Sequence, residues 1–403
     1  MTVGETIHEM AVRARAAAAG LAKKTTAEKD AALLKVADRL EADKAAIMAA
    51  NAADIERARE AGISAAMIDR LTLTEARFKS MVDGVRYVVS LPDPVGETIW
   101  ERRRPSGIDI RKVRVPFGVV AVVFESRPNV FVDTAALCLK TGNAIILRGG
   151  KEAIGSNKAL AASVAAALAE AGMGEAVQFV DILDHAAVTE LVRAVGLVDI
   201  AIPRGGERLI RAMCEAALIP VLKHYKGVCH VYVDDSADLA MALSILDNAK
   251  VQRPSACNAA ETLLVHEKLA PVFLPMVRAW AKDKGVVLHE ADCDWEREFL
   301  ALELNVGIVK DVRAAIEHVN RHGSHHSDCI VTADAARAAE FLRDVDSATV
   351  YHNVSTRFTD GAEFGMGAEI GISTDKLHAR GPMGLEELTT YKYQVTGDGV
   401  VRK

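Results

Sequence analysis

The chain has 403 residues, of which 50% are hydrophobic and 5% aromatic, and it carries a net charge of -6 with a pI near 6.1. This length and composition predict roughly two or three domains of a soluble α/β protein. The acidic balance excludes a general attraction to nucleic acid or to membranes. The longest apolar runs are strand-sized, and the N-terminus lacks a continuous apolar core. We therefore expect neither a membrane span nor a secretory signal.

Amphipathic helices are expected over residues 5–90, where apolar residues recur at three- and four-residue spacing. Thr25 and Glu28 form a capping-box signal for one of them. The stretch Trp100–Gly118 then predicts an extended hairpin with basic residues facing outward. Two interpretations of these residues stay open, a phosphate-binding patch and a solvated arm that packs on another subunit, and the acidic net charge favours the arm. The basic residues are Arg102, Arg103, Arg104, Arg111, Lys112 and Arg114.

From Val119 onward, short apolar strands alternate with helical segments, which indicates βαβ units and mostly parallel sheets. Ligands of such sheets bind beyond the carboxyl ends of the strands. The Gly-rich last fifty or so residues are typical of a functional loop system. The expected strands are Val119–Phe124, Ala144–Leu147, Val177–Val180, Asp199–Ile202, Val231–Val233, Thr262–Val265, Val306–Val309, Cys329–Thr332 and Thr349–Tyr351.

Cys257 differs from the other cysteines in its setting. It stands among small and turn-forming residues just before an apolar strand, with Arg253 nearby to favour a thiolate. The alternative is a half-buried structural cysteine. No CxxC pair or zinc-ligand spacing occurs, so we expect reduced thiols in a cytoplasmic protein. Cys138 and Cys329 lie in apolar segments, which predicts a structural role for both. Cys293 lies between acidic residues, which are expected to raise the pKa of its thiol. The remaining cysteines are Cys214 and Cys229.

Two glycine pairs follow expected strands, and each leads toward a helix. One lies in "RGGK", with Arg148, Gly149, Gly150 and Lys151, and the other in "PRGG", with Gly205 and Gly206. Close backbone approach, a helix N-terminus and a cation suit a phosphate. Glycine for packing alone is the alternative, and no GxGxxG motif is present.

The tract "HGSHHSD" at residues 322–328 has the composition of a metal cluster. Without a second cluster at ligand spacing, a solvated loop is the favoured interpretation, and no metal is expected.

Long motifs of the chain resemble those of the γ-glutamyl phosphate reductases, a branch of the aldehyde dehydrogenase superfamily. They include "VVFESRPNVFVDTAALCLKTGNAIILRGGKEA", "AKVQRPSACNAAETLLVH" and "STRFTDGAEFGMGAEIGISTDKLHARGPMGLEELTTYKY", and the resemblance runs from about residue 5 to residue 393. It implies an aldehyde dehydrogenase-like α/β fold with three parts. These are a Rossmann-like cofactor domain (residues 1–99 and 119–249), an α/β catalytic domain (250–374) and a small β oligomerisation element (100–118 and 388–403).

The resemblance also implies the activity. L-glutamyl 5-phosphate is reduced by NADPH to L-glutamate 5-semialdehyde and phosphate, through a thioester on Cys257, as the second step of proline biosynthesis from glutamate. The backbone N–H of Cys257 and the side chain of Asn129 are the implied oxyanion donors. Where hydrolytic relatives carry a general-base Glu, this chain reads "LKHYKGVCHVYVD". That departure favours a reductase that handles phosphate, and it makes His224 and Lys226 suited to the phosphate.

The same resemblance assigns binding roles. Arg148 and Lys151 suit the 2′-phosphate of NADPH/NADP+, and Arg357 suits the α-carboxylate of the substrate. The implied cofactor-binding set is Arg148, Gly149, Gly150, Lys151, Gly205, Gly206, Glu363 and Phe364, and the implied substrate-binding set is Arg357, Ser355 and Thr356.

Two other functions stay open. One is an aldehyde dehydrogenase that forms the acid from another aldehyde, against which the missing Glu argues. The other is a catalytically silent scaffold, against which the presence of Cys257 argues. The expected partners are the small-molecule substrate, further copies of the chain in a homo-oligomer and, because the acyl phosphate is labile, glutamate 5-kinase. Nucleic acid and membranes are not expected partners.

Overall fold

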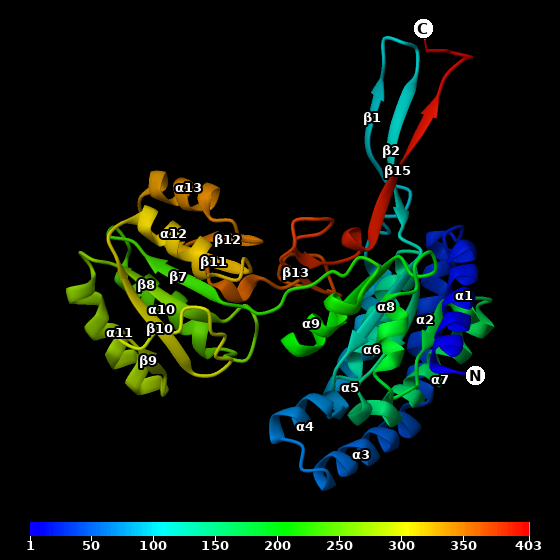
Figure 1. The fold of residues 1–403 in the computed structure, drawn as a ribbon, viewed down its shortest axis with the longest axis horizontal. Coiled ribbons are helices and arrows are strands. Elements are labelled where there is room, and N and C mark those ends of the chain that lie inside the picture. Colours follow the sequence, from blue (N-terminus) through cyan, green and yellow to red (C-terminus); the bar gives the residue numbers. More distant parts are fainter. Residues whose placement is uncertain (403) are drawn as a thin grey trace. The chain divides into compact units, whose positions relative to one another are not determined.

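The computed structural model describes residues 1–402. The chain forms two compact units (Figure 1). Unit 1 holds residues 1–222, 366–371 and the described residues from 383 onward, and unit 2 holds residues 223–365 and 372–382. Among the described residues, no helix has the length and apolar character needed to cross a membrane.

Unit 1 begins with five helices, as the amphipathic pattern predicts. The expected capping box is present, because Thr25 Oγ1 accepts the N–H of Glu28 and the Glu28 carboxylate accepts the N–H of Thr25. Ile7 and Met10 on the first helix pack against the first sheet. The helices are α1 (Val3–Leu21), α2 (Thr26–Ala42), α3 (Lys44–Glu60), α4 (Ala65–Leu71) and α5 (Glu75–Ser90).

The first sheet is parallel throughout and has the order β5-β4-β3-β6. Every residue of β3 and β4 is buried, as expected for strands covered by helices on both faces. The strands are β3 (Val119–Phe124), β4 (Ala144–Arg148), β5 (Val177–Phe179) and β6 (Ile200–Arg204), and the helices are α6 (Asn129–Lys140), α7 (Ile154–Glu170), α8 (Ala186–Val192) and α9 (Glu207–Ala216). Short 3-10 helices are η1 (Lys151–Ala153), η2 (Gly174–Ala176) and η4 (Glu386–Leu388).

The basic hairpin forms β1 (Thr98–Arg103) and β2 (Asp109–Pro116), and β15 (Thr389–Thr396) pairs with β2 to complete an antiparallel sheet. In Figure 1 this sheet, drawn in cyan and red, extends away from the helices of its own unit. Arg103 pairs with Asp109 at 3.1 Å, and Arg114 pairs with Glu97 at 2.7 Å and with Glu386 at 2.6 Å. These ion pairs favour the arm over the phosphate patch.

Unit 2 is built on a second parallel sheet with the order β12-β11-β7-β8-β10-β9. Its first strand in the sequence, β7, pairs with β8 and β11. Residues 223–249 therefore belong to the unit that holds Cys257, whereas the resemblance implies that they belong to the cofactor domain. The strands are β7 (Cys229–Val233), β8 (Ala260–His266), β9 (Val287–His289), β10 (Glu303–Val309), β11 (Ser327–Val331) and β12 (Thr349–His352), and the helices are α10 (Leu239–Val251), α11 (Ala270–Lys284), α12 (Val312–His322) and α13 (Ala335–Asp344). The Gly-rich segment holds η3 (Thr356–Phe358), β13 (Gly371–Ser373) and β14 (Gly381–Met383).

Candidate active site

Cys257 lies on the turn that joins α10 to β8, and its side chain is half-buried. Backbone hydrogen bonds tighten this turn, from Ala256 N to Arg253 O at 3.1 Å and from Ala259 N to Ala256 O at 3.0 Å. Cys138 and Cys329 are fully buried, and burial raises the pKa of both thiols, that of Cys329 to about 12. Their predicted structural role is consistent with this burial. Cys257 therefore differs from them by sitting on a partly accessible turn.

Cys293 is also partly accessible. Burial is the largest cause that raises the pKa of its thiol, and Asp292 adds to the effect. Its Sγ donates to the carbonyl of His289 at 3.0 Å. The expected direction of the shift is correct, although the acids are the smaller cause.

A buried ion pair joins the two elements that flank the Cys257 turn. Lys250 at the end of α10 lies 2.7 Å from Glu261 at the start of β8, and both side chains are fully buried. Burial raises the pKa of Glu261 and lowers that of Lys250, while the charge of the partner opposes both shifts. The Glu261 carboxylate also accepts the N–H of Leu300 at 3.3 Å. The pair ties together the two elements between which Cys257 is held.

The backbone of Cys257 packs directly against the segment before β7. A Cβ placed on Gly227 would lie 2.8 Å from Cys257 Cα and 2.5 Å from its carbonyl carbon, closer than real Cβ contacts. Cys229 Sγ donates to the carbonyl oxygen of Cys257 at 3.4 Å. Burial keeps the pKa of Cys229 well above its ordinary value, so this thiol stays protonated and can donate. These two neighbours fix the backbone that carries the Cys257 thiol.

The predicted substrate residues also reach this turn. Thr356 Oγ1 donates to the carbonyl of Asn258 at 2.7 Å, and the guanidinium of Arg357 donates to the side-chain oxygen of Asn258. Arg357 Nε also donates to Gln252 Oε1 at 2.8 Å. Burial lowers the pKa of Arg357, an effect that Arg253 increases and Cys257 opposes. Ser355 caps η3 by accepting the N–H of Arg357. The structure thus brings Ser355, Thr356 and Arg357 to the residue that follows Cys257.

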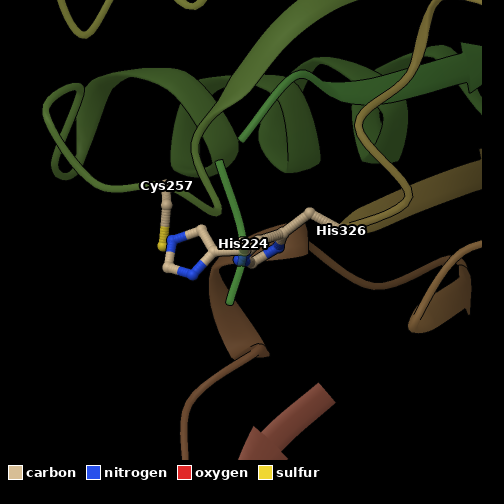
Figure 2. A group of neighbouring side chains, drawn as sticks. All are labelled: His224, Cys257 and His326. Carbon is tan, nitrogen blue, oxygen red and sulfur yellow. The ribbon is translucent and has the colours of Figure 1, made fainter. Parts of the chain in front are cut away.

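Two histidines face the thiol. Figure 2 shows the side chains of His224, Cys257 and His326 pointing toward one another, and one ligand atom from each lies within 4.8 Å of the other two. His224 Nδ1 lies 3.0 Å from the carbonyl oxygen of Ile372. Because a carbonyl only accepts, this bond assigns a proton to Nδ1, and a neutral ring then carries its lone pair on Nε2.

His326 is fully buried, and burial, assisted by the charge of His224, lowers its pKa to about 3. Its Nδ1 lies 2.8 Å from Ser327 Oγ, whereas its Nε2 has no hydrogen-bond partner among the described residues. The interpretation of residues 322–328 as a solvated loop is therefore wrong for His326, Ser327 and Asp328, which are all fully buried. The reason is that pairing of β11 with β7 and β12 draws this part of the tract inside the unit.

The cofactor candidates gather at the first sheet. Arg148 ends β4 and Gly149 and Gly150 follow it, while Gly205 and Gly206 follow β6, so both glycine pairs lie at the carboxyl edge. Lys151 is exposed at the start of η1.

Buried polar atoms without partners in the described part of the chain and a carboxylate both lie at this edge. Arg148 Nε and both side-chain polar atoms of Asn157 are buried and have no hydrogen-bond partner within residues 1–402. A Cβ on Gly149 would meet the Asn157 amide, so only glycine leaves this approach open. At the start of α9, Gly206 N–H donates at 2.8 Å to the carboxylate of Glu125, which occupies the position that suits a phosphate oxygen.

The remaining predicted site residues are Asn129, Glu363 and Phe364. Asn129 begins α6 in unit 1 and donates at 2.8 Å to Asp133, whose pKa burial raises to about 6. Glu363 and Phe364 are exposed in unit 2, on the turn that follows η3. Sequence reasoning missed the roles of Gly227, His326 and the Lys250–Glu261 pair. The signals for the first two are a glycine two residues before a strand and a histidine directly before another.

Comparison with known proteins agrees with this geometry. The model of the aldehyde dehydrogenase family matches residues 3–292. The chain is 49% identical to the γ-glutamyl phosphate reductase of Thermodesulfovibrio yellowstonii and 50% identical to that of Moorella thermoacetica, each over 100% of both chains. The solved structure of γ-glutamyl phosphate reductase from Thermotoga maritima has a TM-score of 0.97 at 43% identity, covering 98% of this chain and 100% of that one. An acetylating aldehyde dehydrogenase from Geobacillus thermoglucosidasius, at 16% identity and a TM-score of 0.71, shares the fold. The expected fold class is confirmed.

Proposed function

The chain belongs to the aldehyde dehydrogenase family and, within it, to the γ-glutamyl phosphate reductases, and from that premise we propose a mechanism in which Cys257 is the nucleophile and NADPH the hydride donor. The chain is an oxidoreductase that reduces L-glutamyl 5-phosphate to L-glutamate 5-semialdehyde and phosphate in proline biosynthesis. The main support for this mechanism is that Cys257 lies on a turn held in place by hydrogen bonds, with Arg357 and His224 beside it.

The first step is activation of the thiol. His224 Nε2 carries the lone pair, because Nδ1 donates to the carbonyl of Ile372, and it accepts the proton of Cys257. The positive charge of Arg357 stabilises the resulting thiolate. A thiolate with a base and an orienting third group is the usual arrangement of an activated cysteine nucleophile.

The second step is acyl transfer. The thiolate attacks the γ-carbonyl, the C–S bond forms, and the C–O bond to phosphate breaks as phosphate leaves. The N–H of Cys257 stabilises the oxyanion that forms on the way. When bound, NADPH supplies the hydride that reduces the acyl carbon. Cys257 then leaves as the thiolate, and the aldehyde is released.

Water must not reach the thioester. Hydrolysis of the thioester needs a carboxylate that activates water. Glu261 pairs with Lys250, and Glu298 accepts the N–H of Gly227 at 2.8 Å, so we assign both carboxylates structural roles. This supports a reductase over an enzyme that hydrolyses the thioester to the acid.

Substrate binding is assigned to Arg357. Its guanidinium carries five donors in one plane, and its bonds to Gln252 and Asn258 fix that plane. A fixed guanidinium recognises the α-carboxylate in a bidentate manner. Ser355 and Thr356 support it through the η3 cap and the Asn258 carbonyl. Asn129 remains proposed as a second oxyanion donor.

The nicotinamide cofactor is assigned to the carboxyl edge of the first sheet. The glycine pairs bind the pyrophosphate, and Arg148 and Lys151 bind the 2′-phosphate that distinguishes NADPH from NADH. Glu363 binds the ribose of the nicotinamide, and Phe364 lies beside it in the sequence. The unpaired polar atoms at Arg148 and Asn157 support this assignment.

A second copy of the chain is proposed to cover β15. This strand is an edge of its sheet, and Tyr391, Tyr393 and Val395 are each about half exposed on one face of it. Trp100 extends this face, because its ring centroid lies 5.8 Å from that of Tyr393. Val395→Lys is expected to shift the sedimentation coefficient to that of a smaller species, while Gln394→Lys on the opposite face leaves it unchanged. An unchanged oligomer in Val395→Lys contradicts the assignment.

All six cysteines are free thiols, and catalysis needs Cys257 reduced, so the proposed location is the cytoplasm. The lability of the acyl phosphate supports contact with glutamate 5-kinase, the enzyme that supplies it.

The test is an assay of glutamate semialdehyde oxidation with NADP+ or NAD+, with and without phosphate. The proposed function predicts turnover that requires phosphate, prefers NADP+, and is lost in Cys257→Ala but retained in Cys293→Ala. Turnover without phosphate or arsenate supports the aldehyde dehydrogenase alternative instead. No turnover in the folded wild-type chain supports the scaffold.

A further inference from the structure

One sulfur and two imidazoles converge at the turn of Cys257, and both histidines are held in the manner of metal ligands. Each has its Nδ1 in a hydrogen bond, His224 to Ile372 O at 3.0 Å and His326 to Ser327 Oγ at 2.8 Å. Histidines that bind metals almost always use the second ring nitrogen in this way, which fixes the ring and its tautomer. The supporting chain continues, because Ser327 Oγ lies 2.5 Å from Thr359 Oγ1, which lies 2.8 Å from the hydroxyl of Tyr351.

The buried Nε2 of His326 is the second, independent observation. It has no hydrogen-bond partner among residues 1–402, although the side chain is fully buried. A buried polar atom without a partner costs free energy, and a bound ligand removes that cost.

We propose that His224, Cys257 and His326 form a binding site for a soft divalent cation such as Zn²⁺, and that the bound cation blocks Cys257. A thiolate with two neutral imidazoles is a donor set that Zn²⁺ prefers, and three protein ligands leave one coordination position open. When the S–Zn bond forms, the Cys257 thiol gives up its proton to solvent. The thiolate pair is then shared with the cation and no longer attacks the acyl phosphate. Binding itself does not depend on the proposed function, whereas the loss of turnover does.

The other cluster of possible ligands among the described residues differs in one decisive way. Asp234, Asp235 and His266 also lie close enough to share a cation. There, however, Arg337 donates to the carboxylates of both Asp234 and Asp235, and Lys268 lies 3.2 Å from Asp235. Side-chain cations of the protein already neutralise that cluster. At Cys257, by contrast, the three ligand atoms converge while the buried Nε2 of His326 has no hydrogen-bond partner among the described residues.

The test uses the full-length chain, stripped of metal with a chelator, and Zn²⁺ or Co²⁺ alone as probes. Zn²⁺ affinity is measured by competition with a chromogenic chelator, and the Co²⁺ complex by its near-ultraviolet thiolate charge-transfer absorption. The wild type is expected to bind about one Zn²⁺ per chain, to release about one proton on binding, and to show the thiolate band. Cys257→Ser is expected to lose the band. His224→Asn and His326→Asn are expected to weaken Zn²⁺ at least about tenfold.

The matched controls are Cys293→Ser, which removes the other partly accessible thiol near a histidine, and His322→Asn, which removes an imidazole from α12. Both are expected to bind Zn²⁺ as the wild type does. Since His326 is buried, His224→Asn provides a test that does not depend on the folding of His326→Asn. Wild-type affinity in both histidine variants, or a thiolate band that persists in Cys257→Ser, overturns the site. A site that binds as expected in a chain without phosphate-dependent turnover leaves this inference standing and contradicts the proposed function alone.

Discussion

Gly227 lies against Cys257 so closely that no side chain fits between them. A Cβ at Gly227 would stand 2.8 Å from Cys257 Cα and 2.5 Å from its carbonyl carbon, and both partners are backbone atoms that cannot rotate away. Glycine is thus required at this position, since any larger residue must displace the turn that carries the Cys257 thiol.

Gly227→Ala is therefore expected to lower kcat by about a hundredfold, because a displacement of roughly 1 Å at a reacting group has that effect. The variant should remain folded and should bind NADPH as the wild type does, which fluorescence titration measures. Gly20→Ala is the control, since a Cβ at Gly20 meets nothing within 4 Å. Wild-type turnover in Gly227→Ala would show that the close approach has no catalytic role.

Removal of one partner of the Lys250–Glu261 pair is expected to destabilise the folded chain strongly. Lys250→Met leaves a buried carboxylate unpaired, which should cost about 3–5 kcal/mol, measured as the shift of the urea midpoint. The double variant Lys250→Met with Glu261→Leu should recover most of that loss, because no charge remains buried. Lys79→Met, which removes half of an exposed pair with Asp83, should change stability by less than about 1 kcal/mol. Equal effects at the two sites would contradict the structural role of the buried pair.

The stability of the chain should fall as the pH drops below about 6.5. Burial lowers the pKa of His326 to about 3, so below 6.5 the unfolded chain takes up a proton that the folded chain excludes. The contribution of this histidine is complete above pH 6.5 and is lost at up to about 1.4 kcal/mol per pH unit until about pH 3. His318, whose pKa burial also lowers to about 3, acts in the same direction.

Urea unfolding at pH 7.5 and pH 5 measures this dependence, and His326→Asn should reduce it. An unchanged pH dependence in this variant would mean that His326 is accessible to protons in the folded state.

Lys151 is expected to set the choice between NADPH and NADH. Lys151→Glu should raise KM for NADPH by about tenfold with little change for NADH, because a carboxylate repels the 2′-phosphate and accepts ribose hydroxyls. Lys158→Glu is the control, since Lys158 lies on α7 and pairs with Asp181 at 3.1 Å. Equal changes in KM for the two cofactors would exclude a role for Lys151 in this selectivity.

Much of the fold follows from local pattern. Alternation of strands and helices predicts β3 to within its observed limits, Val119–Phe124, and the small residues around Cys257 predict its turn. Pairing between distant segments does not follow from local pattern, so the sheet to which β7 belongs was not predictable. His326 was missed for the same reason, because only the pairing of β11 with β7 buries it. The edge strand β9 was missed because Val287 is exposed and the strand lacks a run of buried apolar residues.

The proposed mechanism requires that Cys257 carries the acyl group and that the protein keeps water away from it. The most direct measurement is a rapid-mixing experiment with glutamate semialdehyde and NADP+ in the absence of phosphate, followed by mass spectrometry of the Cys257 peptide. This mechanism predicts a burst of about one NADPH per active site, a glutamyl thioester on Cys257, and steady turnover only after phosphate is added. Continuous NADPH formation without phosphate, or an acyl group on any other residue, would contradict it.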